Sequence, residues 1–239
     1  MIKMIKSLLP AHLVFNIIKF KNNYFDGYSL KSYSQEGEDM ILNRIFENNT
    51  SGFYVDVGAH HPFRFSNTYF FYKRGWRGIN IDALPGSMET FDKFRPRDIN
   101  IEQPVAKSEQ LLTYYSFNEP ALNGFSKALS MQRHGKNGYF IKEEIQLKTV
   151  MLSTILDKYL PKRTIIDFLS IDVEGFDLDI LLSNDWKNYI PKVILIEILE
   201  SSIAKIDNQD ISIFLKNRGY VIIAKTINTV IFKLDERPS

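Results

Sequence analysis

The sequence contains no cysteine among its 239 residues, so it can form neither a disulfide bond nor a thiolate zinc site. It also lacks an excess of one charge, because 30 basic residues nearly balance 28 acidic ones. A nucleic-acid surface is therefore not expected as the main function. The hydrophobic content of 44% is typical of a globular domain, and the absence of cysteine is consistent with a cytoplasmic location.

The amino terminus lacks a long uninterrupted apolar run, because Pro10, His12, Asn16 and Lys19 break it. This excludes a transmembrane segment, and no small-residue cleavage site follows. We expect residues 1–33 to form an amphipathic helix and a linker. The helix could pack on the main domain or on a second copy, in a homo-oligomer, and a membrane-surface anchor is the alternative. Residues 34–239 are then one α/β domain.

The most informative stretch is the apolar run Phe53–Val57, which passes through Asp56 into the small-residue turn Gly58-Ala59. This pattern is typical of a buried strand that ends at a ligand-binding loop. A second strand-like run, residues 76–82, ends at Asp82, 26 residues after Asp56. An acid at the tip of the second strand can bind both hydroxyls of a ribose.

Strand-like runs alternate with helical segments along most of the chain, which predicts a parallel sheet with right-handed crossovers. The last two runs are close together and should pair antiparallel. The predicted fold is a Rossmann-like α/β domain with helices on both faces of a mostly parallel seven-stranded sheet and an antiparallel last hairpin. Its strands are residues 53–57, 76–82, 99–106, 165–172, 192–197, 220–225 and 230–234. Residues 111–117 predict an edge strand or hairpin arm, and the irregular stretch 119–140 predicts a substrate lid.

Acids end four of the predicted core strands, at Asp56, Asp82, Asp172 and Glu197. The carboxyl ends of parallel strands share one edge of the sheet, so we expect these acids to converge there. The chain lacks a full Gly-x-Gly-x-x-Gly, which favours a cofactor that has adenosine but no pyrophosphate. S-adenosylmethionine fits this description. The alternatives are an NAD-dependent oxidoreductase or epimerase, and a non-catalytic binding module.

Five separate motifs resemble those of the FkbM-type methyltransferases, in the right order and spacing. They are Ser34–Asp39, Val55–Ala59, Ser66–Tyr69, Gly75–Asp82 and Ile171–Gly175. The resemblance covers about residues 33 to 200. It implies a class I methyltransferase fold, S-adenosylmethionine as cofactor, and O-methylation of a hydroxyl on a sugar or natural product.

The strand ends and this resemblance together give a set of expected site residues. Those expected at the cofactor are Gln35, Glu38, Asp56, Gly58, Ala59, Thr68, Asp82, Ala83, Ala106 and Asp172. A sugar hydroxyl loses its proton as it attacks, so a base within hydrogen-bond reach is expected. The candidates for this catalytic role are His60, His61, His134, Asp172 and Glu174. His61 precedes Pro62, so capping of the turn is the alternative role for that residue.

Asp172 and Glu197 also resemble the ligands of magnesium-dependent, catechol-type O-methyltransferases. The resemblance implies a Mg²⁺ ion that lowers the pKa of the acceptor hydroxyl. The alternative is that both acids bind loop backbone and shape the cavity. We expect an S-adenosylmethionine-dependent O-methyltransferase whose partner is a small sugar, such as a nucleotide-linked precursor of a surface polysaccharide.

Overall fold

The computed structural model describes residues 10–25, 27–200 and 202–235. The chain divides into two compact units, Met1–Ser32 and Tyr33–Ser239. The smaller unit contains helix α2 (Ala11–Tyr24), in which no residue is buried. Residues 1–9 of the expected amino-terminal helix lie outside the described part. Every helix in the described ranges is too short or too polar to cross a bilayer.

The larger unit is built on a seven-stranded sheet with the order β3-β2-β1-β6-β7-β9-β8. Its strands are β1 (Phe53–Val57), β2 (Arg77–Asp82), β3 (Ile99–Glu102), β6 (Phe168–Ile171), β7 (Val193–Glu197), β8 (Tyr220–Lys225) and β9 (Thr229–Leu234). The first five pair in parallel, and β9 pairs antiparallel with both β7 and β8. The predicted class I methyltransferase fold is confirmed, including the antiparallel last hairpin.

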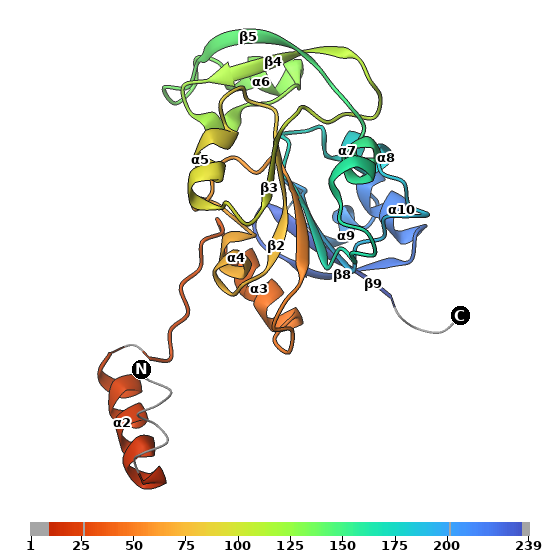
Figure 1. Ribbon diagram of the computed structural model, residues 1–239. Helices are drawn as coiled ribbons and strands as arrows, with labels where there is room; N and C mark the ends of the chain where they lie inside the picture. The colour runs from red at the N-terminus through yellow and green to blue at the C-terminus, as the bar shows by residue number, and fades with distance from the viewer. Residues whose placement is uncertain (1–9, 26, 201, 236–239) are drawn as a thin grey trace. The chain divides into compact units, whose positions relative to one another are not determined.

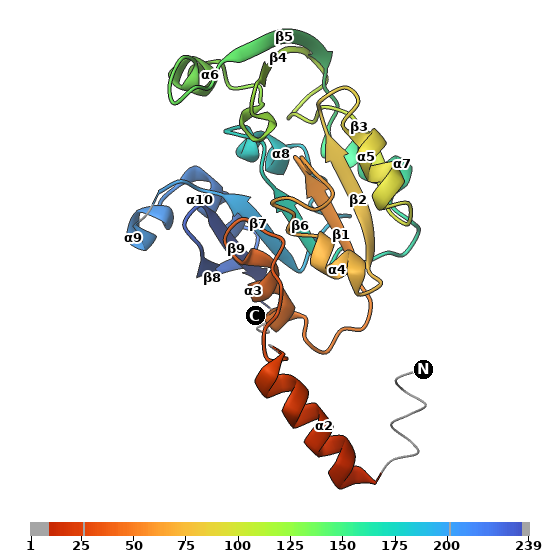
Figure 2. The same cartoon turned by 90° about the vertical axis from the view of Figure 1, so that its left-hand side faces the viewer.

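Helices cover both faces of this sheet, with α3, α4 and α5 on one side and α7, α8 and α10 on the other (Figures 1 and 2). The helices of this unit outside residues 118–140 are α3 (Glu38–Ile45), α4 (Tyr69–Lys73), α5 (Met88–Phe94), α7 (Leu152–Tyr159), α8 (Asp177–Leu182), α9 (Ile203–Ile206) and α10 (Asp210–Lys216). Alternation along the strands fills two cores. In β7, for example, Val193 and Leu195 join the core with Trp76, whereas Ile194 and Ile196 join the core with Leu156. Burial on both faces explains why these strands are apolar throughout.

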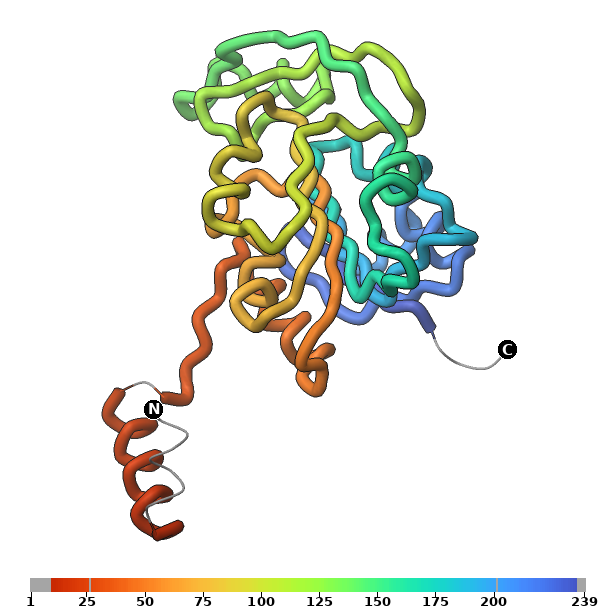
Figure 3. Tube along the Cα trace, viewed as in Figure 1, coloured from red at the N-terminus to blue at the C-terminus, as the bar shows by residue number. Residues whose placement is uncertain are grey.

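A separate two-stranded sheet and two short helices lie above the carboxyl ends of the main strands (Figure 1). We call residues 103–151, the yellow-green to green part of the trace in Figure 3, the cap. The sheet pairs β4 (Leu111–Phe117) with β5 (Ile141–Lys148) antiparallel. Between them are η1 (Pro120–Leu122) and α6 (Lys127–Arg133). Of the two alternatives for residues 111–117, the hairpin arm is the correct one, because β4 pairs with β5 and not with the main sheet. One detail differs from the sequence expectation: residues 119–140 contain regular helices.

Candidate active site

A cavity of about 300 Å³ opens at the carboxyl ends of the parallel strands, where the strand order reverses between β1 and β6. Such a reversal is where open α/β sheets bind ligands. Residues at the ends of β1, β2, β6 and β7 form one side of the cavity, and the cap forms the other. Five acidic residues of the described chain line it: Asp56, Asp82, Asp172, Glu174 and Glu197. The acids that end four strands therefore meet in one space.

The turn after β1 contains two residues with positive φ, Gly58 at 82° and His60 at 53°. A Cβ atom on Gly58 would lie 1.8 Å from the carbonyl oxygen of Asp172, so only glycine fits against the end of β6. His60 lines the cavity, and its Nε2 atom is buried without a hydrogen-bond partner among the described residues. Burial, with a smaller contribution from Arg64, lowers the pKa of His60 and favours the neutral imidazole.

Asp82 ends β2 and is fixed by two backbone N–H groups. Its Oδ2 accepts from the N–H of His60 at 2.9 Å, and its Oδ1 accepts from the N–H of Leu84 at 2.9 Å. Burial raises the pKa of Asp82, and these two hydrogen bonds oppose the rise. Each carboxylate oxygen keeps a lone pair that can accept a hydrogen bond from a ligand.

Asp56 is held from behind by a buried polar network. The Thr68 hydroxyl donates to Asp56 Oδ2 at 3.0 Å and accepts from Arg95 Nη1 at 2.9 Å. Arg95 has no exposed surface, and its guanidinium also pairs with Asp98 at 2.8 Å and donates to the Tyr54 hydroxyl. Burial raises the pKa of Asp56, and the Arg95 charge opposes the rise.

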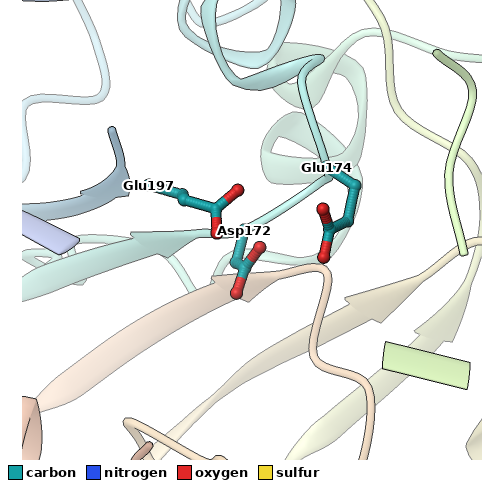
Figure 4. Close-up of side chains that lie close together, drawn as sticks. All are labelled: Asp172, Glu174 and Glu197. Carbon is teal, nitrogen blue, oxygen red and sulfur yellow. The ribbon is translucent and has the colours of Figure 1, made fainter. Parts of the chain in front are cut away.

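Three carboxylates crowd the opposite end of the cavity, and we call Asp172, Glu174 and Glu197 the acidic cluster. Figure 4 shows them turned toward a common space, and one carboxylate oxygen of each lies within 4.8 Å of the others. Glu174 adopts a φ of 53°, in the left-handed region. Arg133 of α6 lines the cavity and pairs with Glu174 at 2.7 Å. The cap therefore brings a positive charge to this cluster.

Burial and mutual repulsion raise the pKa values of two carboxyl groups in the acidic cluster. Burial, followed by repulsion from Glu197 and Glu174, holds the pKa of Asp172 well above its usual range. Burial and then repulsion from Glu174 and Asp177 raise the pKa of Glu197 to about 8. Arg133 opposes both shifts. At neutral pH this end of the cavity therefore retains a proton unless a cation binds there.

The family model described as the methyltransferase FkbM domain matches residues 56–222, from β1 into β8. The chain belongs to this family. No curated protein matches the chain. The matched range includes every acidic residue of the cavity, whereas Gln35 and Asn228, which also line the cavity, lie outside the range.

The structure brings most of the expected site residues of this FkbM domain to the cavity. Those that line it are Gln35, Asp56, Gly58, Ala59, His60, Asp82, Ala83, Asp172, Glu174 and Glu197. Five others do not line it: Glu38, His61, Thr68, Ala106 and His134.

Each of these five residues has another role in the fold. The Nδ1 atoms of His61 and His134 accept backbone hydrogen bonds, in the turn after β1 and at the end of α6. Glu38 accepts from the Thr226 hydroxyl at 2.9 Å, and the Ala106 N–H donates to the Val150 carbonyl. Thr68 supports Asp56 from outside the cavity.

Several cavity residues were not expected from the sequence. Tyr114, Asn123 and Arg133 come from the cap, and Gln103 follows β3. Asn67 lies within a motif that the sequence did highlight, and its amide donates to the Ser170 hydroxyl at 3.1 Å. Tyr114 lies in the stretch 111–117 predicted as a strand, and Asn123 and Arg133 lie in the predicted lid 119–140, but no motif singled out these three residues.

Proposed function

We propose that this FkbM methyltransferase transfers the methyl group of S-adenosylmethionine to a hydroxyl of a sugar. The observation that carries the proposal is the convergence of four strand-end acids on one cavity of ligand size. Membership of the family makes the chain a methyltransferase. The donor, the oxygen acceptor and the sugar are inferred from the chemistry of the cavity.

The residues present fit S-adenosylmethionine. Asp82 would bind the ribose hydroxyls with the lone pairs that its two backbone contacts leave free. The turn at Gly58 and Ala59, together with Gln35, would hold the methionine part. When bound, the cofactor supplies a methyl carbon made electrophilic by a positively charged sulfonium. The carboxyl groups of Asp56 and Asp172 would offset that positive charge.

An NAD-dependent oxidoreductase or epimerase fits the cavity less well. Pyrophosphate binding needs backbone that approaches the ligand at several glycines, and the turn after β1 has only Gly58. The space beside Gly58 is already filled by the carbonyl of Asp172. Five acidic residues around one cavity would also repel a pyrophosphate.

His60 is the best-placed histidine to accept the proton of the acceptor hydroxyl. It lines the cavity, its Nε2 makes no other hydrogen bond, and burial favours its neutral form. His61 and His134 each use a ring nitrogen to bind backbone and do not line the cavity. A neutral imidazole at this place can accept a proton directly or through one water.

The acidic cluster offers a second way to activate the hydroxyl. Its oxygens are the ligand type that Mg²⁺ prefers, and a divalent ion would remove the repulsion among Asp172, Glu174 and Glu197. In this route the three side chains would hold the metal, and the metal would lower the pKa of the hydroxyl. Dependence of turnover on added Mg²⁺ separates this route from proton transfer to His60.

The acceptor would enter between the cap and the sheet. A second, more open hollow of about 370 Å³ shares Glu197 and Leu199 with the cavity. Two ion pairs, Arg133–Glu174 and Arg64–Glu119, connect residues 119–140 to the sheet side of the cavity, which supports a role for that segment as a lid.

The five acidic residues of the cavity favour an acceptor that is neutral or cationic at the reacting centre. If the sugar is a nucleotide-linked polysaccharide precursor, its diphosphate must lie outside the cavity. The cytoplasmic location expected from the lack of cysteine suits such a substrate.

A screen for S-adenosylhomocysteine release tests the proposal. The panel should contain neutral sugars, amino sugars and nucleotide-linked sugars, each with and without Mg²⁺. We expect turnover with at least one sugar and its loss in Asp82→Asn. The matched control is Glu102→Gln, because Glu102 pairs with Asp82 across β2 and β3 but does not line the cavity. Binding of the cofactor without turnover on any acceptor would instead favour a binding module.

A further inference from the structure

Helix α2 has a wide apolar face that is open to solvent. Leu13, Ile17, Phe20 and Tyr24 follow the spacing i, i+4, i+7, i+11 and therefore lie on one face, with 42% to 72% of their surface exposed. Val14 and Ile18 widen this face, and Phe15, which is 64% exposed, lies beyond them on the far side of the helix. His12, Asn16, Lys19 and Asn23 follow the same spacing one residue earlier and form the polar face. This pattern is that of an amphipathic helix at an apolar boundary.

The charges of this segment indicate what kind of surface covers the apolar face. Residues 1–25 contain four lysines, Lys3, Lys6, Lys19 and Lys21, and no acidic residue. Lys21 lies one turn beyond Ile17, within the apolar face itself. A protein partner that buried this face would have to supply a carboxylate for Lys21, or the ammonium would be buried unpaired. A phospholipid surface supplies phosphates, which a long lysine side chain reaches while its methylenes remain in apolar contact.

A second copy of α2 does not meet these requirements. Two α2 helices would bring lysines together without any carboxylate of their own to pair with them. The helix has 14 residues. A helix of that length is about 21 Å long, so one face offers well under the ~800 Å² per partner that a stable interface buries. An anionic lipid surface needs no such area of matched packing, because apolar insertion and charge attraction act together.

We propose that α2 binds parallel to an anionic phospholipid surface, with Leu13, Ile17, Phe20 and Tyr24 in the apolar boundary layer and the ammonium groups of Lys19 and Lys21 at the phosphates. This holds the FkbM domain beside a membrane. The surface is independent of the cavity, so the proposal does not depend on which acceptor the domain methylates.

Flotation of the full chain with lipid vesicles tests the proposal. We expect binding to vesicles of phosphatidylcholine mixed with phosphatidylserine, and weak or no binding to phosphatidylcholine alone. Changing Lys19→Gln and Lys21→Gln together should weaken partitioning about 30-fold, since each lysine near an anionic surface contributes about a fivefold factor. High salt should have a similar effect on the parent chain.

A matched pair of double variants separates the two faces at constant charge. Ile17→Gln with Phe20→Gln should weaken partitioning about 100-fold, because two large apolar side chains lose their insertion. Asn16→Gln with Asn23→Gln, on the polar face of the same helix, should leave it unchanged. Since none of these residues is buried, the thermal unfolding of each variant should match that of the parent.

Three results would overturn the proposal. One is failure of the full chain to float with either vesicle. Another is equal binding by both double variants. The third, from light scattering without lipid, is a dimer that Ile17→Gln with Phe20→Gln converts to a monomer, which would assign the face to a second copy.

Discussion

The two ends of the cavity hold their carboxyl groups in opposite ways. At one end, Asp56 and Asp82 accept hydrogen bonds from Thr68 and from two backbone N–H groups, and a buried arginine lies behind Asp56. At the other end, the acidic cluster places three carboxyl groups together, and its ion pair comes from Arg133 in the cap. The carboxyl groups of the first end are therefore held in place before a ligand binds. The acidic cluster, in contrast, is stabilised when it binds a proton or a cation.

This difference suggests a division of labour within one cavity. Fixed acceptors suit a ligand that binds in the same way in every cycle, as a cofactor does. Burial raises the pKa of carboxyl groups at both ends, but only in the acidic cluster does strong repulsion among the carboxyl groups add to it, which suits a place where charge changes during the reaction. Four predictions test this comparison.

The largest effect is expected at Arg95, on which the fixed end depends. Arg95→Met leaves Asp98 and Asp56 buried without their cation, so we expect a loss of about 3–5 kcal/mol in the free energy of unfolding. Urea denaturation measures it. The control is Arg97→Met, two residues along on the exposed surface, for which we expect a change within about 0.5 kcal/mol. Equal changes in the two variants would contradict the structural role of the network.

Asp82 should control cofactor affinity. Hydrogen bonds to a charged group contribute about 1.5–3 kcal/mol, so Asp82→Asn should weaken S-adenosylmethionine binding about 10- to 100-fold. Calorimetric titration measures the dissociation constant. Glu102→Gln, beside it in the sheet, should bind like the parent. A parent-like constant for Asp82→Asn would remove the ribose assignment.

Glu197 should make the free energy of unfolding fall as pH rises, whereas an ordinary paired carboxylate has the opposite effect. Its folded pKa of about 8 lies above the ordinary value of 4.5, so the folded state holds the proton more tightly. The resulting stabilisation is complete below the unfolded pKa and is lost as pH rises through the folded pKa. Glu197→Gln removes the part of this pH dependence that Glu197 contributes, while the raised pKa of Asp172 keeps its own part. Above pH 8 we expect the variant to exceed the parent by at least about 1.4 kcal/mol, the equivalent of one pKa unit.

Unfolding of parent and variant across this pH range checks the sign. If the free energy of unfolding changes with pH in the same way in both proteins, Glu197 does not hold the proton. Added Mg²⁺ refines the result: if the metal route operates, Mg²⁺ should stabilise the parent more than Glu197→Gln at high pH.

The smallest effect is expected at Thr68. Thr68→Val removes the hydroxyl that joins Arg95 to Asp56, and one lost hydrogen bond of this kind contributes about 1 kcal/mol. We expect cofactor affinity to fall about fivefold, with Thr68→Ser restoring it because the hydroxyl is kept. Calorimetry follows the change. If valine and serine behave alike, Thr68 does not position Asp56.

Much of the sheet could be predicted from the sequence, because buried parallel strands are recognisable as apolar runs. The strand ends also located Asp56, Asp82, Asp172 and Glu197, since parallel strands share one edge. The finer roles of polar residues could not be read in this way. Thr68 and Glu38 belong to motifs that supply other cavity residues, but neither residue lines the cavity. The Thr68 hydroxyl binds Asp56, and the Glu38 carboxyl group binds Thr226.

The cap was the least predictable part. Helix α6 is one short helix between glycine-rich turns, and its position follows from tertiary contacts such as Arg133–Glu174. Similarly, ranking His60, His61 and His134 required the structure, although Pro62 after His61 already indicated a turn-capping role for that residue. Their difference depends on which ring nitrogen binds backbone, and that is decided by the fold of two turns.

The most direct test of the central claim is a crystal structure of the complex with S-adenosylhomocysteine. We predict that the ribose hydroxyls lie within hydrogen-bond distance of the Asp82 carboxylate and that the ligand occupies the cavity between the strand ends and the cap. A ligand bound elsewhere on the chain, with Asp82 free of contact, would contradict the account.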